Sequence, residues 1–152
     1  PFPQKDYRFQ WSKNFHTVSN RTAINFKCVR HLSLAGQRSI GRCKFHFVNA
    51  TELTLDQITP TNYNVNTLAL QQIIPLENLT KLEILSHDYS FQDLVRFLSL
   101  LHHLHTLKIR RIHCSEETDF TTFPNSDLFQ FVSNVNMIRT LAITDVNDAK
   151  EV

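Results

Sequence analysis

Two Cys-x-x-His pairs have the residue types and spacing that come closest to a chemical site in this sequence. The four residues are Cys28, His31, Cys43 and His46. Such side chains are the usual ligands of tetrahedral zinc. The alternative is that two buried cysteines stand beside two surface histidines. We favour the alternative, because Arg30 and Lys44 occupy turns where zinc knuckles use small residues, and because outward-facing His31 lies an odd number of positions from Cys28.

Three histidines form a second group, at His102, His103 and His105. A histidine cluster can bind a metal or change its charge near neutral pH. Alternatively, histidines at the C-terminus of a helix stabilise the helix dipole when they are protonated. No carboxylate is spaced to complete a metal site, so we favour the second interpretation and expect no bound metal.

Motifs of catalysis and of cofactor binding are missing from the sequence. It contains only two glycines, Gly36 and Gly41, and has no P-loop, dinucleotide fingerprint, nucleophile elbow or zinc-protease motif. Phosphate cradles and strained catalytic loops generally need glycine. The sequence therefore predicts a protein that is not an enzyme and that uses no cofactor.

The charges are divided unevenly along the chain. Residues 1–50 hold nine Lys or Arg and one Asp, whereas residues 51–152 hold seven basic and thirteen acidic residues. With Tyr7, Phe9 and Trp11 interleaved, the basic first third could form a nucleic-acid-binding module. Because no run of adjacent basic residues occurs, we favour solvated side chains on ordinary strands, and nucleic acid is not the partner that we expect.

Length and cysteine content indicate one intracellular domain. A chain of 152 residues favours a single domain, 1–152, and the Pro1 start suggests a piece of a longer chain. Three cysteines, an odd number, favour reduced thiols in the cytoplasm or nucleus. We see no secretory signal and no apolar stretch long enough for a bilayer, and we expect no membrane partner.

A repeated pattern, apolar-x-x-Leu-x-apolar, is the strongest structural signal. Its central leucines are Leu32, Leu53, Leu82, Leu107 and Leu141. The spacings of 21, 29 and 25 residues fit leucine-rich repeats, and the last, 34, implies an inserted loop over residues 112–124. Each short strand has one apolar face, which neighbouring strands must help to bury. The pattern predicts an α/β fold: a leucine-rich-repeat-like solenoid of about five parallel strand units.

The segments between these strands predict helices or irregular segments on the convex side. We expect a helix over residues 91–101, begun by Ser90 and Asp93, one over residues 65–74, ended by Pro75, and a third from residue 125 or 126. The repeats would cover residues 29–146. Residues 1–28 would form an irregular N-terminal cap with short extended segments, at residues 7–11 and 24–28, and residues 147–152 a tail.

The stretches 50–55, 74–84 and 104–109 resemble the irregular leucine-rich repeats of F-box proteins. The resemblance covers about residues 29–146 and implies a curved solenoid that holds a protein substrate for a cullin-type ubiquitin ligase. The chain departs from regular repeats because Asn is missing at the turn positions, which are Gln37, Ile58, His87, Ile112 and Val146. A ligase adaptor would be a partner only if an F-box precedes Pro1.

The strand pattern also predicts which side chains face outward and form a protein-binding surface. They are His31, Ser33, Glu52, Thr54, Lys81, Glu83, Thr106, Lys108 and Arg110, with Thr140 and Thr144 in the last unit. Arg is frequent among the residues that dominate binding energy, so Arg110 is the strongest single candidate. The expected function is a protein–protein interaction module that binds a protein partner on the strand face.

Overall fold

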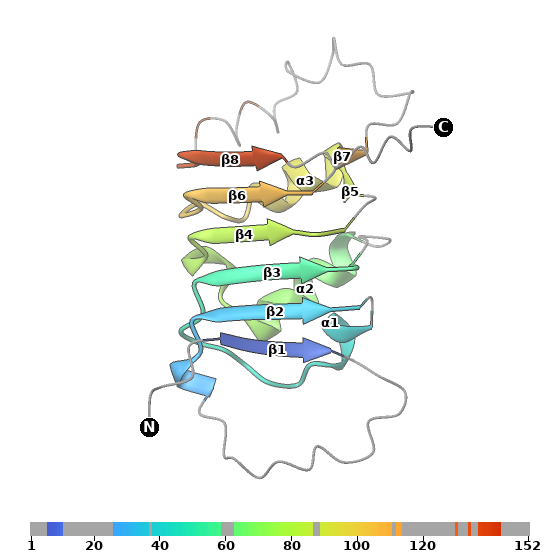
Figure 1. The fold of residues 1–152 in the computed structure, drawn as a ribbon, viewed down its shortest axis with the longest axis vertical. Coiled ribbons are helices and arrows are strands. Elements are labelled where there is room, and N and C mark those ends of the chain that lie inside the picture. Colours follow the sequence, from blue (N-terminus) through green and yellow to red (C-terminus); the bar gives the residue numbers. More distant parts are fainter. Residues whose placement is uncertain are drawn as a thin grey trace, which may run out of the picture.

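The computed structural model describes residues 6–10, 26–36, 38–58, 63–86, 89–110, 112–113, 130, 134 and 137–143. Within these ranges the protein is an α/β structure built on an open sheet of six parallel strands (Figure 1). The strands run in the order β1 (Asp6–Gln10), β2 (His31–Ala35), β3 (Glu52–Asp56), β4 (Lys81–Ile84), β6 (Thr106–Ile109) and β8 (Thr140–Ile143). The order in space is therefore the order in the chain.

Helical segments lie on one side of this sheet, behind it in the view of Figure 1. They are α1 (Ser39–Arg42), α2 (Tyr63–Ile73) and α3 (Phe91–Leu98), and two short 3-10 turns, η1 (Phe26–Cys28) and η2 (Leu76–Asn78), precede strands. A second, two-stranded parallel sheet pairs β5 (Tyr89–Ser90) with β7 (Ile112–His113). No helix of the described residues is long and apolar enough to cross a membrane.

One unbroken register aligns the central leucines of the repeated pattern. Leu32 pairs with Leu53, Leu53 with Leu82, Leu82 with Leu107, and Leu107 with Leu141. The predicted adjacency of these residues is confirmed. The sheet contains one strand more than the expected five, because Tyr7 of β1 extends the same row by pairing with Leu32.

The hydrophobic core lies between the sheet and the helices. The sheet contributes the inward side chains of β2, β3, β4 and β6, from Leu32 to Ile109, and these are almost entirely buried. Ile40 of α1, Ile73 of α2 and Phe97 of α3 belong to the same cluster. Each buried Leu or Phe stabilises the fold by roughly 1.5–3 kcal/mol relative to exposure. The alternation of apolar and polar residues along each strand therefore decides which side the helices cover.

Leu141 departs from the expected burial. It keeps the predicted register with Leu107, yet 58% of it is exposed, and Ile143 beside it is also exposed. The expectation that neighbouring strands bury the apolar face of each unit is wrong at this position, because β8 is an edge strand of the six-stranded sheet. Leu82, by contrast, has a paired strand on each side and is fully buried.

The approach to each inner strand repeats a backbone pattern. Four tight turns close with an N–H to C=O bond between residues three apart, from Val29 to Phe26, Ala50 to Phe47, Leu79 to Leu76 and Leu104 to Leu101. Two successive N–H groups at the start of a strand then donate to one carbonyl just before the neighbouring strand. Thr51 and Glu52, at the start of β3, donate in this way to Arg30, which precedes β2. The same pair recurs at β4, β6 and β8. In these four turns the residue three positions before the motif is apolar; Phe47, Leu76 and Leu101 are buried, and Phe26 is partly buried.

Serine side chains satisfy the backbone where strands end, in a chain that has no asparagine at the expected turn positions. The buried Ser86 hydroxyl accepts from the Ile58 N–H at 2.9 Å and donates to the Ile58 carbonyl at 2.6 Å. Buried Ser39 donates to the carbonyl of Ala35. At this turn Gly36 has a φ of 85°, which a residue without Cβ adopts freely.

The other expected elements are met in part. The helices expected over 65–74 and 91–101 correspond to α2 and α3, and the extended segment expected near Tyr7 is β1. The extended segment expected over residues 24–28 is wrong where it is described, because Phe26–Cys28 form the 3-10 turn η1. This turn holds the partly buried Phe26 against the core, and the fully buried Val29 follows it. The inserted loop was expected over residues 112–124, but Ile112 and His113 form β7. The rest of that loop, residues 114–124, lies outside the described residues, as do Thr144, Val146 and most of the third helix.

Replacing Leu82 by Ala should lower the free energy of unfolding by about 2–5 kcal/mol, since it removes buried methyl groups and leaves a cavity. Leu141→Ala is a matched control at the same register position, and its exposure predicts a change within about 0.5 kcal/mol. Urea denaturation of both variants measures the difference. Equal losses would contradict the packing described for the two strands.

Candidate functional site

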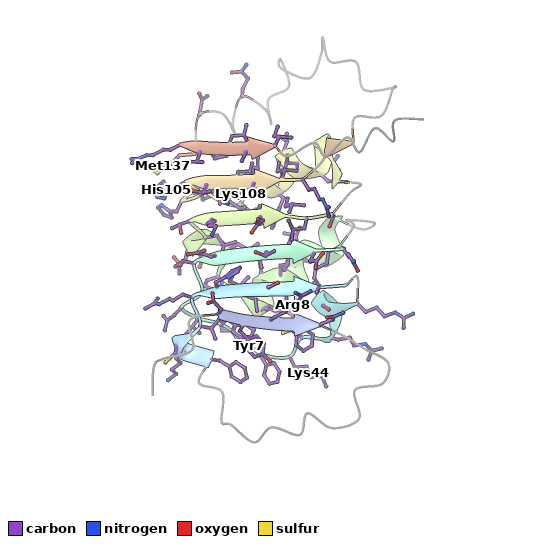
Figure 2. The ribbon with its side chains drawn as sticks, in the orientation of Figure 1. Tyr7, Arg8, Lys44, His105, Lys108 and Met137 are labelled. Atoms are coloured by element: carbon purple, nitrogen blue, oxygen red, sulfur yellow. The ribbon has the colours of Figure 1, made fainter. Side chains whose placement is uncertain are left out.

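The open face, which is the side of the six-stranded sheet turned away from the helices, is the candidate functional site (Figure 2). Strand register arranges its side chains in two rows that run across the strands. The first row is Asp6, His31, Glu52, Lys81, Thr106 and Thr140, and the second is Arg8, Ser33, Thr54, Glu83, Lys108 and Ala142. All the outward residues predicted within β2, β3, β4 and β6 thus lie on this face.

Exposure is not uniform over the open face. His31, Ser33, Glu52, Lys81, Glu83 and Thr106 are half-buried, whereas Lys108, Arg110 and Thr140 are exposed. Thr54 is only 7% exposed because neighbouring side chains cover it. The face is therefore packed around Thr54 and open toward β6 and β8.

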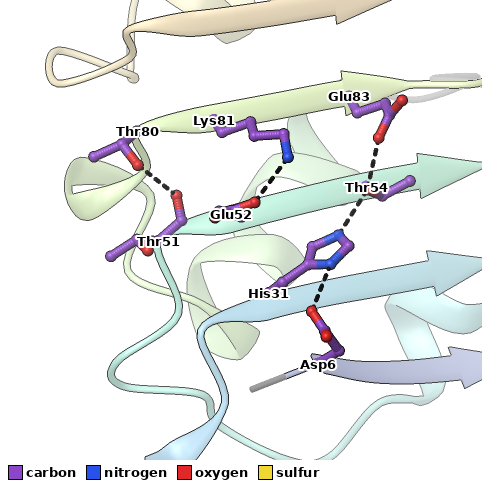
Figure 3. A network of polar contacts seen from close by, with 8 residues as sticks. All are labelled: Asp6, His31, Thr51, Glu52, Thr54, Thr80, Lys81 and Glu83. Carbon is purple, nitrogen blue, oxygen red and sulfur yellow. Dashed lines mark hydrogen bonds and ion pairs between the residues drawn. The ribbon is translucent and has the colours of Figure 1, made fainter.

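A network of hydrogen bonds between side chains crosses β1, β2, β3 and β4 on the open face (Figure 3). His31 bonds through Nδ1 to Asp6 Oδ1 at 3.1 Å and through Nε2 to Thr54 Oγ1 at 2.8 Å. The Thr54 hydroxyl in turn lies 3.4 Å from Glu83 Oε2, to which it can donate. Side-chain bonds therefore tie β1, β2, β3 and β4 together on the face that the helices leave uncovered.

The order of groups in this network, from the Asp6 carboxylate through the His31 imidazole to the Thr54 hydroxyl, resembles the contacts of a hydrolase triad. A triad also needs donors aimed at the developing oxyanion. Thr54 lies at the centre of β3 with paired strands on both sides. The surrounding backbone N–H groups therefore donate their hydrogen bonds to carbonyls of the neighbouring strands. Among the described residues the arrangement therefore bonds neighbouring strands to one another, and the backbone N–H groups beside Thr54 are taken up by the sheet ladder.

Two ion pairs compensate most of the remaining charge on the open face between β1 and β4. Lys81 Nζ donates to Glu52 Oε2 at 2.9 Å, and Arg8 Nη2 donates to Asp56 Oδ2 at 3.2 Å. The hydrogen bond to Glu52 raises the pKa of Lys81 above its usual value. Both pairs are partly exposed, so each contributes about 0–1 kcal/mol. Their main consequence is that these charges are already matched within the protein.

Lys108 and Arg110 have no such partner in the part of the chain that the structure describes. Within the described residues neither forms an ion pair, although register places Glu83 beside Lys108. The two basic residues line a hollow of about 170 Å³ at the carboxyl ends of β4 and β6. Glu83 also borders it, and Leu85 and Ala142 supply apolar surface. Basic donors beside apolar contacts are thus concentrated at one end of the open face.

The Cys-x-x-His pairs do not converge in the part of the chain that the structure describes. No group of three or more His, Cys, Asp or Glu is placed there to hold a metal ion. Both ring nitrogens of His31 are bonded to Asp6 and Thr54, and His46 Nδ1 donates to the Gln72 carbonyl at 2.8 Å. Burial raises the pKa of the Cys43 thiol, which disfavours the thiolate that zinc binds.

The three clustered histidines occupy a different place from the one expected. Helix α3 ends at Leu98, so His102 follows it by four residues and lies in the turn before β6. The prediction of a helix C-terminus is therefore wrong. His103 and His105 instead line a second hollow, at the amino ends of the strands.

An aromatic cluster at the β1 end of the core was also missed by the repeat pattern. Phe26 stacks on Phe45 with ring centroids 4.5 Å apart and meets Phe47 edge-on at 5.3 Å, and Tyr7 packs against Phe47 at 5.2 Å. Burial raises the pKa of Tyr7. Phe26 and Phe47 each lie three positions before the first residue of a strand motif, and this spacing could have revealed them in the sequence.

Comparison with protein-family models, with curated proteins and with solved structures finds no match to this chain. The functional argument therefore depends on the geometry of the open face.

The Lys81–Glu52 pair predicts a pH dependence. Because the folded pKa of Lys81 is raised, its contribution to stability is fully present below the unfolded pKa, about 10.4, and is lost as pH rises through the folded pKa. NMR titration of the Lys81 side chain should give a pKa above 10.5 in the native protein and a lower one in Glu52→Gln. An unchanged pKa in that variant would contradict the assigned cause.

Bonding of His31 and His46 within the protein predicts that purified protein contains no stoichiometric zinc. Treatment with a chelator should leave the melting temperature unchanged, because no metal would stabilise the native state. Elemental analysis checks the metal content directly. One zinc per chain would show that the Cys-x-x-His pairs act as ligands.

Proposed function

We propose that this protein is a protein–protein interaction module that binds its partner on the open face, through Lys108 and Arg110. The observation that carries the proposal is that these two basic residues border one hollow and form no ion pair with any residue that the structure describes. Elsewhere on the face the basic side chains of Arg8 and Lys81 already have carboxylate partners. A partner therefore gains more from contacting β6 than β1.

The chemistry of the hollow indicates what it would bind. Arg110 can donate two parallel hydrogen bonds to a carboxylate, and Lys108 adds a compact positive charge. Leu85 and Ala142 offer apolar contact beside these donors. A protein segment with an acidic side chain next to a small apolar one fits this arrangement. Glu83 at the border would repel a carboxylate placed too near β4, which fixes its position.

The finer architecture of the proposal is a leucine-rich-repeat-like solenoid. Its support is the recurrence of one unit: a tight turn, a doubled hydrogen bond at the strand entry and a short parallel strand. Such units bury their apolar faces by stacking and leave a continuous surface for recognition. The surface of this chain would then be the open face.

The resemblance to F-box proteins extends the proposal to substrate recognition for a cullin-type ubiquitin ligase. In that role the open face would hold the substrate, and an F-box upstream of Pro1 would hold the adaptor. The cytoplasm or nucleus would be the compartment, as the cysteine content suggests.

The decisive experiment compares two variants in affinity capture with quantitative mass spectrometry. Lys108→Ala with Arg110→Ala should leave the melting temperature nearly unchanged, since both side chains are exposed and form no ion pair within the described ranges. Capture of the main partner should fall about tenfold or more, with the larger share due to Arg110. The partner so identified is then purified and titrated against the same variants.

A control variant, altered to Ala at Lys5, Arg8 and Lys13, tests the basic first third of the chain. Retained capture is expected, because Arg8 is matched by Asp56. Loss of binding in this variant alone would move the site away from β6. If the bound material were then nucleic acid, with affinity falling steeply as salt rises, the rival function would replace the proposed one.

A further inference from the structure

A second hollow, distinct from the open face, crosses the amino ends of β2, β3, β4 and β6. Its volume is about 350 Å³, and its lining comes from the residues just before these strands. Figure 2 shows His105 at the amino end of β6, with Lys108 farther along the same strand. The hollow is thus separated from the Lys108–Arg110 site by the length of a strand.

Among the residues that the structure describes, the lining of this hollow contains basic and hydrogen-bonding side chains and no acidic one. Its basic residues are Arg30, His103 and His105, and its polar residues include Asn78, Thr51 and Thr80. Arg30 uses one N–H to bond the Asn49 carbonyl and keeps other donors, since guanidinium has five. An imidazole donates at least one N–H in either ionisation state. Nearby Glu52 is paired with Lys81, so it does not neutralise these donors.

The shape of the hollow follows from the strand register. Arg30 precedes β2 and His105 precedes β6, so the two lie three parallel steps apart, about 14 Å at 4.8 Å per step. An extended peptide covers this distance with four or five residues at about 3.3 Å each. Backbone N–H groups at the strand entries already donate within the protein, as those of Thr51 and Thr80 do. Side chains would therefore make the contacts to a ligand.

We propose that this hollow binds an extended acidic peptide, whose carboxylates meet Arg30 at one end and His103 with His105 at the other. Charge complementarity selects the occupant, because carboxylates are the acceptors that guanidinium and imidazole donors bind best. The peptide runs across the strand entries, parallel to the rows of the open face. This site is independent of the Lys108–Arg110 site and adds a second contact region to the protein.

The test measures fluorescence anisotropy of a labelled hexaglutamate peptide titrated with the intact chain, with hexaglutamine as the neutral control. Wild-type protein should bind hexaglutamate and not hexaglutamine. Arg30→Gln and His103→Glu should each weaken binding about tenfold, the loss expected for a hydrogen bond to a charged group. His103 is exposed and forms no hydrogen bond among the described residues, so its variant should keep the wild-type fold.

Matched controls change the same residue types outside the hollow. Arg38→Gln and His102→Glu alter exposed residues that do not line it, and both variants should bind within about twofold of wild type. Lys108→Ala with Arg110→Ala should also retain binding, which separates this site from the proposed function. Equal weakening in His102→Glu and His103→Glu, loss only in the Lys108 and Arg110 variant, or no binding by wild-type protein would each overturn the proposal.

Discussion

The in-register stacking of parallel strands is the constraint on which the rest of the structure depends. Because side chains alternate along a strand, a slip of one residue would exchange the buried and exposed sets. The row of leucines from Leu32 to Leu107 fixes this register, since each leucine is fully or almost fully buried only when its neighbours align. The doubled hydrogen bonds at the strand entries hold the same alignment.

Register also decides where the open face has spare charge. It brings Lys81 beside Glu52 and places His31 and Glu83 at bonding distance from Thr54, so the β1 to β4 end is matched internally. At β6 the same alternation leaves Lys108 exposed beside a hollow. The proposed function is thus a consequence of which residues the leucine row carries to the opposite side.

Much of this arrangement could be predicted from sequence because it depends on local periodicity. The alternation of apolar and polar residues around Leu53 and Leu82 predicted which side chains face the core. Equal spacing from the central leucines predicted which residues lie side by side on adjacent strands. Three features depend on contacts distant in the chain. Exposure of Leu141 follows from its place at the sheet edge, Ser86 bonds a turn 28 residues away, and Arg8 reaches Asp56 across a strand. The spacing of residues along the sequence does not predict these contacts.

Methyl NOE spectroscopy on the free protein tests the register most directly. Methyl groups of Leu53 and Leu82, and of Leu82 and Leu107, should show strong contacts, because parallel strands lie about 4.8 Å apart. The methyl group of Thr54 should show none to the Leu82 methyl groups, since the two residues lie on opposite sides of the sheet. Strong contacts between Thr54 and Leu82, with none between Leu53 and Leu82, would contradict the register and with it the open face.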